Sequence, residues 1–95
     1  MLTTAGTIPV TAAGVLSDGP VILAGVIIRN THATNAGVFR IYDNATTNSG
    51  TILFTANLAA GAHIHLPLYI TVNALKGLYL AISGSATAEG CVLIA

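Results

Sequence analysis

Two histidines on one predicted strand, His63 and His65, have the spacing in this chain that comes nearest to a chemical site. Successive side chains of a strand point to opposite faces, so an i, i+2 pair places both imidazoles on one face, opposite Ile64. Two imidazoles make half of a tetrahedral zinc site, and the third ligand would have to come from His32, from Asp43 or from a symmetry-related copy. Ordinary exposed or interface histidines are the simpler reading, so we expect no metal and no cofactor.

The carboxylates are too dispersed for acid–base catalysis. Asp18, Asp43 and Glu89 fall in or beside different predicted turns, and no serine lies in a nucleophile-elbow pattern. Asp43 and Asn44 directly follow a predicted strand, where their simplest use is to cap a turn; calcium or sugar contacts are the alternatives. The ten glycines are spread through turns and form no phosphate-binding loop. The sequence therefore predicts a protein that is not an enzyme.

Charge is scarce in this chain. Three basic and three acidic residues are its whole charge complement, and 54% of its 95 residues are hydrophobic. A folded chain of 9.6 kDa exposes roughly 5,000 Å², and ordinary domains are about 25% charged. The chain is either a poorly soluble small domain decorated with Thr, Ser and Asn, or a subunit whose outside is largely buried against other subunits. We favour the second interpretation.

The composition also argues against several partners. The three basic residues, Arg29, Arg40 and Lys76, are scattered and the net charge is zero, so we expect that the protein does not bind nucleic acid. The apolar run over residues 20–28 is far shorter than the roughly 20 residues of a membrane helix. The N-terminus lacks signal-peptide features, so we expect neither membrane insertion nor secretion. Cys91 is the only cysteine and is expected to be an inert thiol, which leaves oligomerisation to stabilise a thin core.

Short runs of β-branched and aromatic residues, separated by Gly, Asn, Ser and Thr clusters, predict an all-β protein. We expect an antiparallel β-sandwich of seven or eight short strands, jelly-roll or immunoglobulin-like, over residues 11–95. Residues 1–10 are expected to form an extended N-terminal arm, with a disordered terminus as the alternative. Pro67 cannot donate a ladder hydrogen bond and so predicts an edge strand or a bulge. The expected strands are residues 21–29, 38–43, 51–57, 62–70, 78–83 and 91–95, with one or two weaker strands within residues 7–16.

Two of the predicted strands are apolar on both faces. In residues 21–28 and in residues 91–95, apolar side chains occupy odd and even positions alike. Such a strand is either central in a sheet or faces a neighbouring subunit, and two of them in so small a domain favour an assembly. We therefore predict an interface with other subunits that contains Val21, Leu23, Val26, Ile28, His63, His65 and Leu93.

A strand–loop–strand pattern with a tyrosine–aspartate turn is carried by residues 21–28, 38–45, 49–54 and 77–84. In this pattern, which covers most of residues 20–95, the chain resembles small virion-structural proteins of tailed bacteriophages. The resemblance implies a compact β-sandwich that attaches to the major capsid protein or to another virion protein, as decoration or cement proteins do, often as a trimer. It also implies a location in the virion, after assembly in the host cytoplasm.

We accordingly expect a non-enzymatic capsid decoration or cement protein that binds the particle surface as a homo-oligomer and stabilises subunit junctions. A phage tail or fibre component with the same fold is the alternative within the particle. A small carbohydrate-binding module is the alternative from another class, and it would need Tyr42 and the loops at 30–37 and 44–50 to form a concave aromatic patch. A secreted adhesion domain is a third possibility, against which the N-terminal sequence argues.

Overall fold

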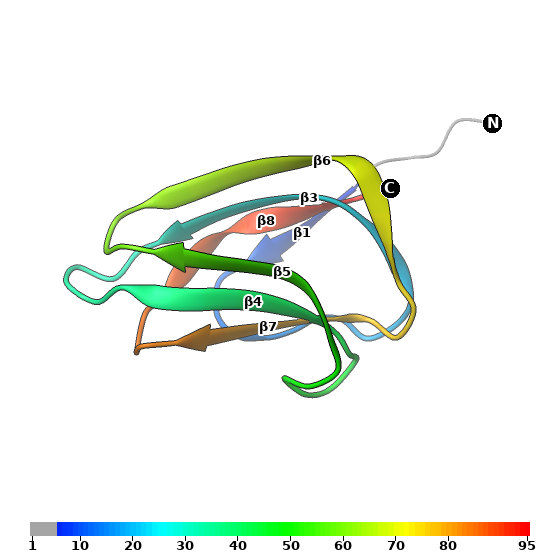
Figure 1. The fold of residues 1–95 in the computed structure, drawn as a ribbon, viewed down its shortest axis with the longest axis horizontal. Coiled ribbons are helices and arrows are strands. Elements are labelled where there is room, and N and C mark those ends of the chain that lie inside the picture. The colour runs from blue at the N-terminus through cyan, green and yellow to red at the C-terminus, as the bar shows by residue number, and fades with distance from the viewer. Residues whose placement is uncertain (1–5) are drawn as a thin grey trace.

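The computed structural model describes residues 6–95, and for residues 67–71 it describes the backbone alone. Over this range the chain forms eight β-strands arranged in two antiparallel four-stranded sheets that pack face to face (Figure 1). The prediction of an all-β antiparallel sandwich is confirmed. The described part of the chain has no helix of the length and apolarity needed to cross a membrane.

The strands alternate between the two sheets along most of the chain. The first sheet has the order β1-β8-β3-β6 and the second the order β2-β7-β4-β5. The six strands predicted with clear patterns correspond to β3–β8, and the weaker ones to β1 and β2. The bounds are β1 (Gly6–Val10), β2 (Gly14–Ser17), β3 (Val21–Asn30), β4 (Gly37–Asp43), β5 (Thr51–Leu58), β6 (His63–Ala74), β7 (Leu78–Ser83) and β8 (Ala88–Ile94).

The prediction of an N-terminal arm over residues 1–10 is wrong for residues 6–10. Residues 6–10 form β1, which pairs with β8 from Gly6↔Ile94 to Val10↔Gly90. Val10 is buried in the core and Ile8 packs against it, so this segment belongs to the sandwich. Only these two side chains reach the core, which is why the sequence shows so little pattern there. Residues 1–5 lie outside the described residues.

β3 owes its doubly apolar sequence to a bulge. Its pairing with both β6 and β8 shifts register between Leu23 and Gly25. Before the shift the odd-numbered Leu23 faces the core, and after it the even-numbered Val26 and Ile28 do; all three are 0% exposed. A bulge inserts one extra residue and so reverses the inward parity of a strand. β3 is also central, between β8 and β6, which was one of the two predicted explanations.

A second register shift changes the inward set of β5. Alternation alone would place Ile52 on the same face as Phe54, but the pairing with β4 shifts between Ile41 and Tyr42, so that Tyr42 pairs with Ile52. As a result Ile52 is 49% exposed, while Leu53 packs against the core.

The core fills the space between the two sheets. Its buried members come from both layers: Val10, Leu23, Val26, Ile28, Ala74, Ala88 and Val92 from the first sheet, and Phe39, Ile41, Phe54, Leu58, Leu78 and Leu80 from the second. The prediction that Pro67 lies on an edge strand or at a bulge is confirmed. Its strand, β6, is at the edge of the first sheet, and the pairing of β6 with β3 is irregular next to the Gly25↔Pro67 pair.

Asn30, at the end of β3, is a fully buried polar residue. Its Nδ2 donates to the carbonyl oxygens of Asn35 (2.9 Å) and Leu58 (3.1 Å), and its Oδ1 accepts from the backbone N–H of His32 (3.0 Å). Its backbone N–H also donates to the Ala62 carbonyl. Buried polar groups must be paired in this way, so Asn30 joins the β3–β4 loop to the β5–β6 turn.

Replacing Asn30 is therefore expected to destabilise the fold strongly. Asn30→Ala leaves two buried or part-buried carbonyls and one N–H without their partner, at a cost of about 3 kcal/mol in the free energy of unfolding. Urea denaturation followed by circular dichroism measures this cost. Asn48→Ala, in an exposed loop, is the matched control and should stay within about 0.5 kcal/mol of the wild type. Equal effects of the two substitutions would contradict the role assigned to Asn30.

Candidate functional site

The outer face of the first sheet is the surface of β1, β8, β3 and β6 that points away from the core. Strand register arranges its residues in transverse rows. Thr7, Leu93 and Gly25 form the first row, Pro9, Cys91, Ile27 and His65 the second, and Glu89, Arg29 and His63 the third. The face thus carries apolar side chains in its middle and a charged pair towards one end.

The apolar middle of this face is covered only in part. Ile27, Cys91 and Leu93 are half-buried, yet they are not among the residues that pack against the core. Leu93 lies over Gly25, since a Cβ on Gly25 would come within 2.9 Å of Leu93 Cδ1. Partly exposed apolar side chains that adjoin one another on an outer face make a candidate contact surface.

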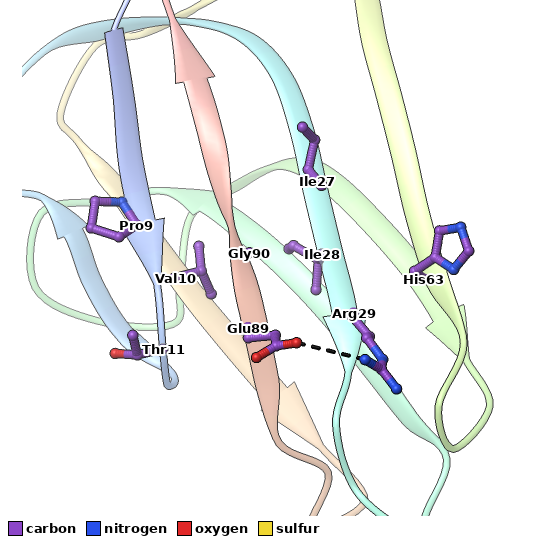
Figure 2. Close-up of a pocket in the computed structure, with 9 residues that line it drawn as sticks. All are labelled: Pro9, Val10, Thr11, Ile27, Ile28, Arg29, His63, Glu89 and Gly90. Atoms are coloured by element: carbon purple, nitrogen blue, oxygen red, sulfur yellow. Dashed lines mark ion pairs between the residues drawn. The ribbon is translucent and has the colours of Figure 1, made fainter.

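A hollow of about 480 Å³ opens in the charged part of this face (Figure 2). Gly90 lies at its floor with a φ of +143°, and a Cβ there would run into the carbonyl oxygen of Ile27. The close approach of β8 to β3 at this point therefore requires glycine. The lining consists of Pro9, Val10, Thr11, Ile27, Ile28, Arg29, His63, Glu89 and Gly90.

Arg29 and Glu89, which both line the hollow, form a loose ion pair between the neighbouring strands β3 and β8 (Figure 2). The distance from Nη1 to Oε1 is 3.8 Å, and the two side chains are 58% and 63% exposed. A charge-assisted hydrogen bond is about 1 Å shorter, and an exposed pair of this kind contributes little to folding. Both groups therefore keep hydrogen-bonding capacity for another molecule.

The structure divides the seven predicted interface residues between the surface and the core. His63 and His65 are exposed on the outer face, as the i, i+2 spacing predicted, and Leu93 lies there half-buried. Val21 packs against the core.

For Leu23, Val26 and Ile28 the structure corrects the prediction. All three are fully buried in the core and offer no surface to another subunit. The bulge in β3 is the reason, because odd-numbered residues face the core before it and even-numbered residues face the core after it. The same bulge hid the residues of β3 that do face outward, Ile27 and Arg29. The glycine inside this strand, Gly25, was the available signal, since an isolated glycine in a strand often marks a bulge.

The two candidates for a third metal ligand are both engaged in turns. The Nδ1 atom of His32 accepts the backbone N–H groups of Thr34 (3.1 Å) and Asn35 (2.9 Å). The Asp43 carboxylate accepts those of Leu75, Lys76 and Gly77, described below. Among the residues that the structure describes, no three His, Cys, Asp or Glu side chains come together in a group that could hold a metal ion.

Asp43 and Asn44 cap turns, as their position after a strand predicted. The Asp43 carboxylate accepts the backbone N–H groups of Leu75 (3.1 Å), Lys76 (2.8 Å) and Gly77 (3.4 Å), which tie the β6–β7 turn to the end of β4. Asn44 Oδ1 accepts from the backbone of the loop that follows it. Desolvation acts to raise the pKa of Asp43, but the three N–H groups and the Lys76 charge outweigh it and lower the pKa below its usual value.

The lowered pKa gives Asp43 a defined contribution to acid stability. A carboxyl whose pKa is lower in the folded state stabilises the protein above its unfolded-state pKa, and this contribution is lost as the pH falls through the folded-state value. We expect Asp43→Asn to reduce the free energy of unfolding by about 1 kcal/mol at pH 7. The difference from the wild type should shrink below about pH 4. Urea titrations between about pH 7 and pH 2 test this, and a difference that does not change with pH would contradict it.

A second apolar row crosses the outer face of the second sheet. Strand register places Val15, Tyr79, Tyr42 and Ile52 side by side, and Val15 and Ile52 are about half exposed, at 48% and 49%. A small hollow of about 130 Å³ lies beside Tyr42, with Arg40, Asn48 and Ser83 in its lining. The concave patch that a sugar-binding module would need, made by Tyr42 and the loops at 30–37 and 44–50, does not form, because the two loops lie at opposite ends of β4 (Figure 1).

Comparisons with protein families, with characterised proteins and with solved structures find no match to this chain.

Proposed function

We propose that this chain is a non-enzymatic structural protein that works as a homo-oligomer, and that it is a capsid decoration or cement protein of a bacteriophage virion. The observation that carries the proposal is the outer face of the first sheet, where half-buried apolar side chains lie outside the core. The virion part of the proposal rests on the sequence resemblance to phage structural proteins. That resemblance also favours a trimer, the major capsid protein as partner, and a location in the assembled particle.

The distribution of charge supports an assembled protein. Six charged side chains share an accessible surface of 5358 Å², so most of the outside is apolar or carries uncharged polar groups. Association removes apolar area from water, and it stabilises whichever state presents the complementary surface. A decoration protein acts in this way when it binds across subunit junctions of a particle.

We also propose that the sandwich is a jelly roll. The support is the strand order, since β1-β8-β3-β6 and β2-β7-β4-β5 alternate along the chain in the manner of two Greek keys. An immunoglobulin-like sandwich would instead pair its first two strands within one sheet. The fold serves many functions, so the functional proposal does not depend on it.

The direct test is the mass of the purified protein by light scattering, from about 1 μM to about 1 mM. We expect a mass that rises to a closed multiple of 9.6 kDa, because covering the apolar outer face stabilises the associated state. A monomer at every concentration would contradict the proposal.

Quantitative mass spectrometry of particles made from the encoding genome then separates the two virion roles. A decoration protein is expected at a copy number comparable to that of the major capsid protein, and a tail or fibre component in far fewer copies.

A carbohydrate-binding module is the second candidate, and one observation favours it. Tyr42 and Tyr79 are cross-strand neighbours, and the small hollow beside Tyr42 contains Arg40 and Asn48, which could hydrogen-bond sugar hydroxyls. The absence of tryptophan from the chain weakens this candidate. A protein that remains monomeric in the light-scattering test would bring it to first place.

A further inference from the structure

We propose that the outer face of the first sheet docks against the same face of a second copy, about a two-fold axis that runs along the strands between β3 and β8. This inference rests on the self-association proposed above and names the surface and the symmetry of the contact. Isologous contacts about a two-fold axis are the commonest in soluble oligomers, and they require a self-complementary surface.

The charged row is self-complementary about this axis. Arg29 and Glu89 are register partners on β3 and β8, so the axis passes between them. Rotation about it places Arg29 opposite Glu89 of the partner subunit, and Glu89 opposite the partner's Arg29. The 3.8 Å separation and the high exposure of the pair within one chain leave both groups free to make shorter hydrogen bonds across the contact.

The apolar rows are complementary about the same axis. Ile27 and Cys91 are register partners, as are Gly25 and Leu93. Rotation therefore places Ile27 opposite Cys91 of the partner subunit, and Leu93 opposite the partner's Gly25. In one row the apolar side chains of Ile27 and Cys91 meet. In the other row each copy's Leu93 covers its own Gly25, so the two leucines meet beside the axis. Stacked sheets pack in this interdigitated way about 10 Å apart.

The hollow removes the main steric objection to such packing. Long charged side chains that stand on a sheet face would normally hold two faces apart. Here the charged pair borders a hollow of about 480 Å³, which gives the arginine and glutamate of the opposite copy a place to lie. The outer face of the second sheet has no such match, because Arg40 is in register with Ala81 and Thr55.

The size of the face predicts a reversible contact. The four strands of this sheet have 5, 7, 10 and 12 residues and cover roughly 550 Å² in projection, whereas a standard interface buries about 800 Å² on each partner. We therefore expect a dissociation constant in roughly the micromolar range. The contact by itself builds a dimer. The trimer favoured by the resemblance needs a separate three-fold contact on another surface, and the two contacts together give a hexamer.

Charge-reversal variants test the proposal. The dissociation constant is measured by sedimentation equilibrium for the wild type, Arg29→Glu, Glu89→Arg, the double variant and an equimolar mixture of the two single variants. Each single variant places like charges opposite one another and should weaken association by roughly tenfold or more. The double variant and the mixture should both regain the wild-type affinity. Arg40→Glu, with the same change in net charge as Arg29→Glu, is the control and should associate as the wild type does.

The mixture separates the contact between copies from the ion pair within one chain, because mixing two single variants cannot restore an intrachain pair. Thermal melts by circular dichroism show that each variant folds. If the wild type self-associates and both single variants do so with the same affinity, this inference is overturned while the proposed function stays intact. Weakened single variants that do not recover on mixing would overturn the two-fold pairing. A wild type that remains monomeric would overturn both the inference and the proposed function.

Discussion

The bulge in β3 is the constraint on which the first sheet depends. The register shift between Leu23 and Gly25 is shared by the pairings of β3 with β6 and with β8, so it sets the phase of three strands together. Gly25 leaves little room for a side chain, because a Cβ would lie 2.9 Å from Leu93 Cδ1, which would have to move, and 3.3 Å from the Leu66 carbonyl oxygen. A one-residue slip would reverse every side chain beyond this point.

The buried Asn30 and the residues of the outer face both follow from which side chains of β3 the bulge turns inward. Beyond the bulge the even-numbered residues of β3 face inward, so Asn30 reaches the buried position from which it joins two loops. The odd-numbered residues face outward, so Ile27 joins Cys91 and Arg29 joins Glu89 in rows across the sheet. The buried polar residue and the outer face are therefore two consequences of one irregularity in the backbone.

Local pattern in the sequence was enough to predict the fold class and six of the strands, because β-branched runs and turn residues act over short range. The orientation of side chains in β3 and β5 could not be predicted in the same way, since each bulge is fixed by pairing with other strands. This is why Leu23, Val26 and Ile28 were assigned to an interface, and why alternation alone would place Ile52 on the same face as Phe54. The hollow was also out of reach, because it needs the mutual register of β1, β8, β3 and β6. The histidine pair was placed correctly because β6 keeps regular alternation there.

If a second copy covers the outer face of the first sheet, the Cys91 thiol on that face becomes less accessible to solvent. This half-buried thiol lies in the middle row of the face, between Pro9 and Ile27. The decisive measurement is the rate of maleimide labelling of Cys91, by pulse labelling and mass spectrometry, at protein concentrations from well below to well above the association midpoint. The account predicts that labelling slows as the protein associates. A labelling rate that stays constant while the mass of the protein in solution rises would show that association uses another surface.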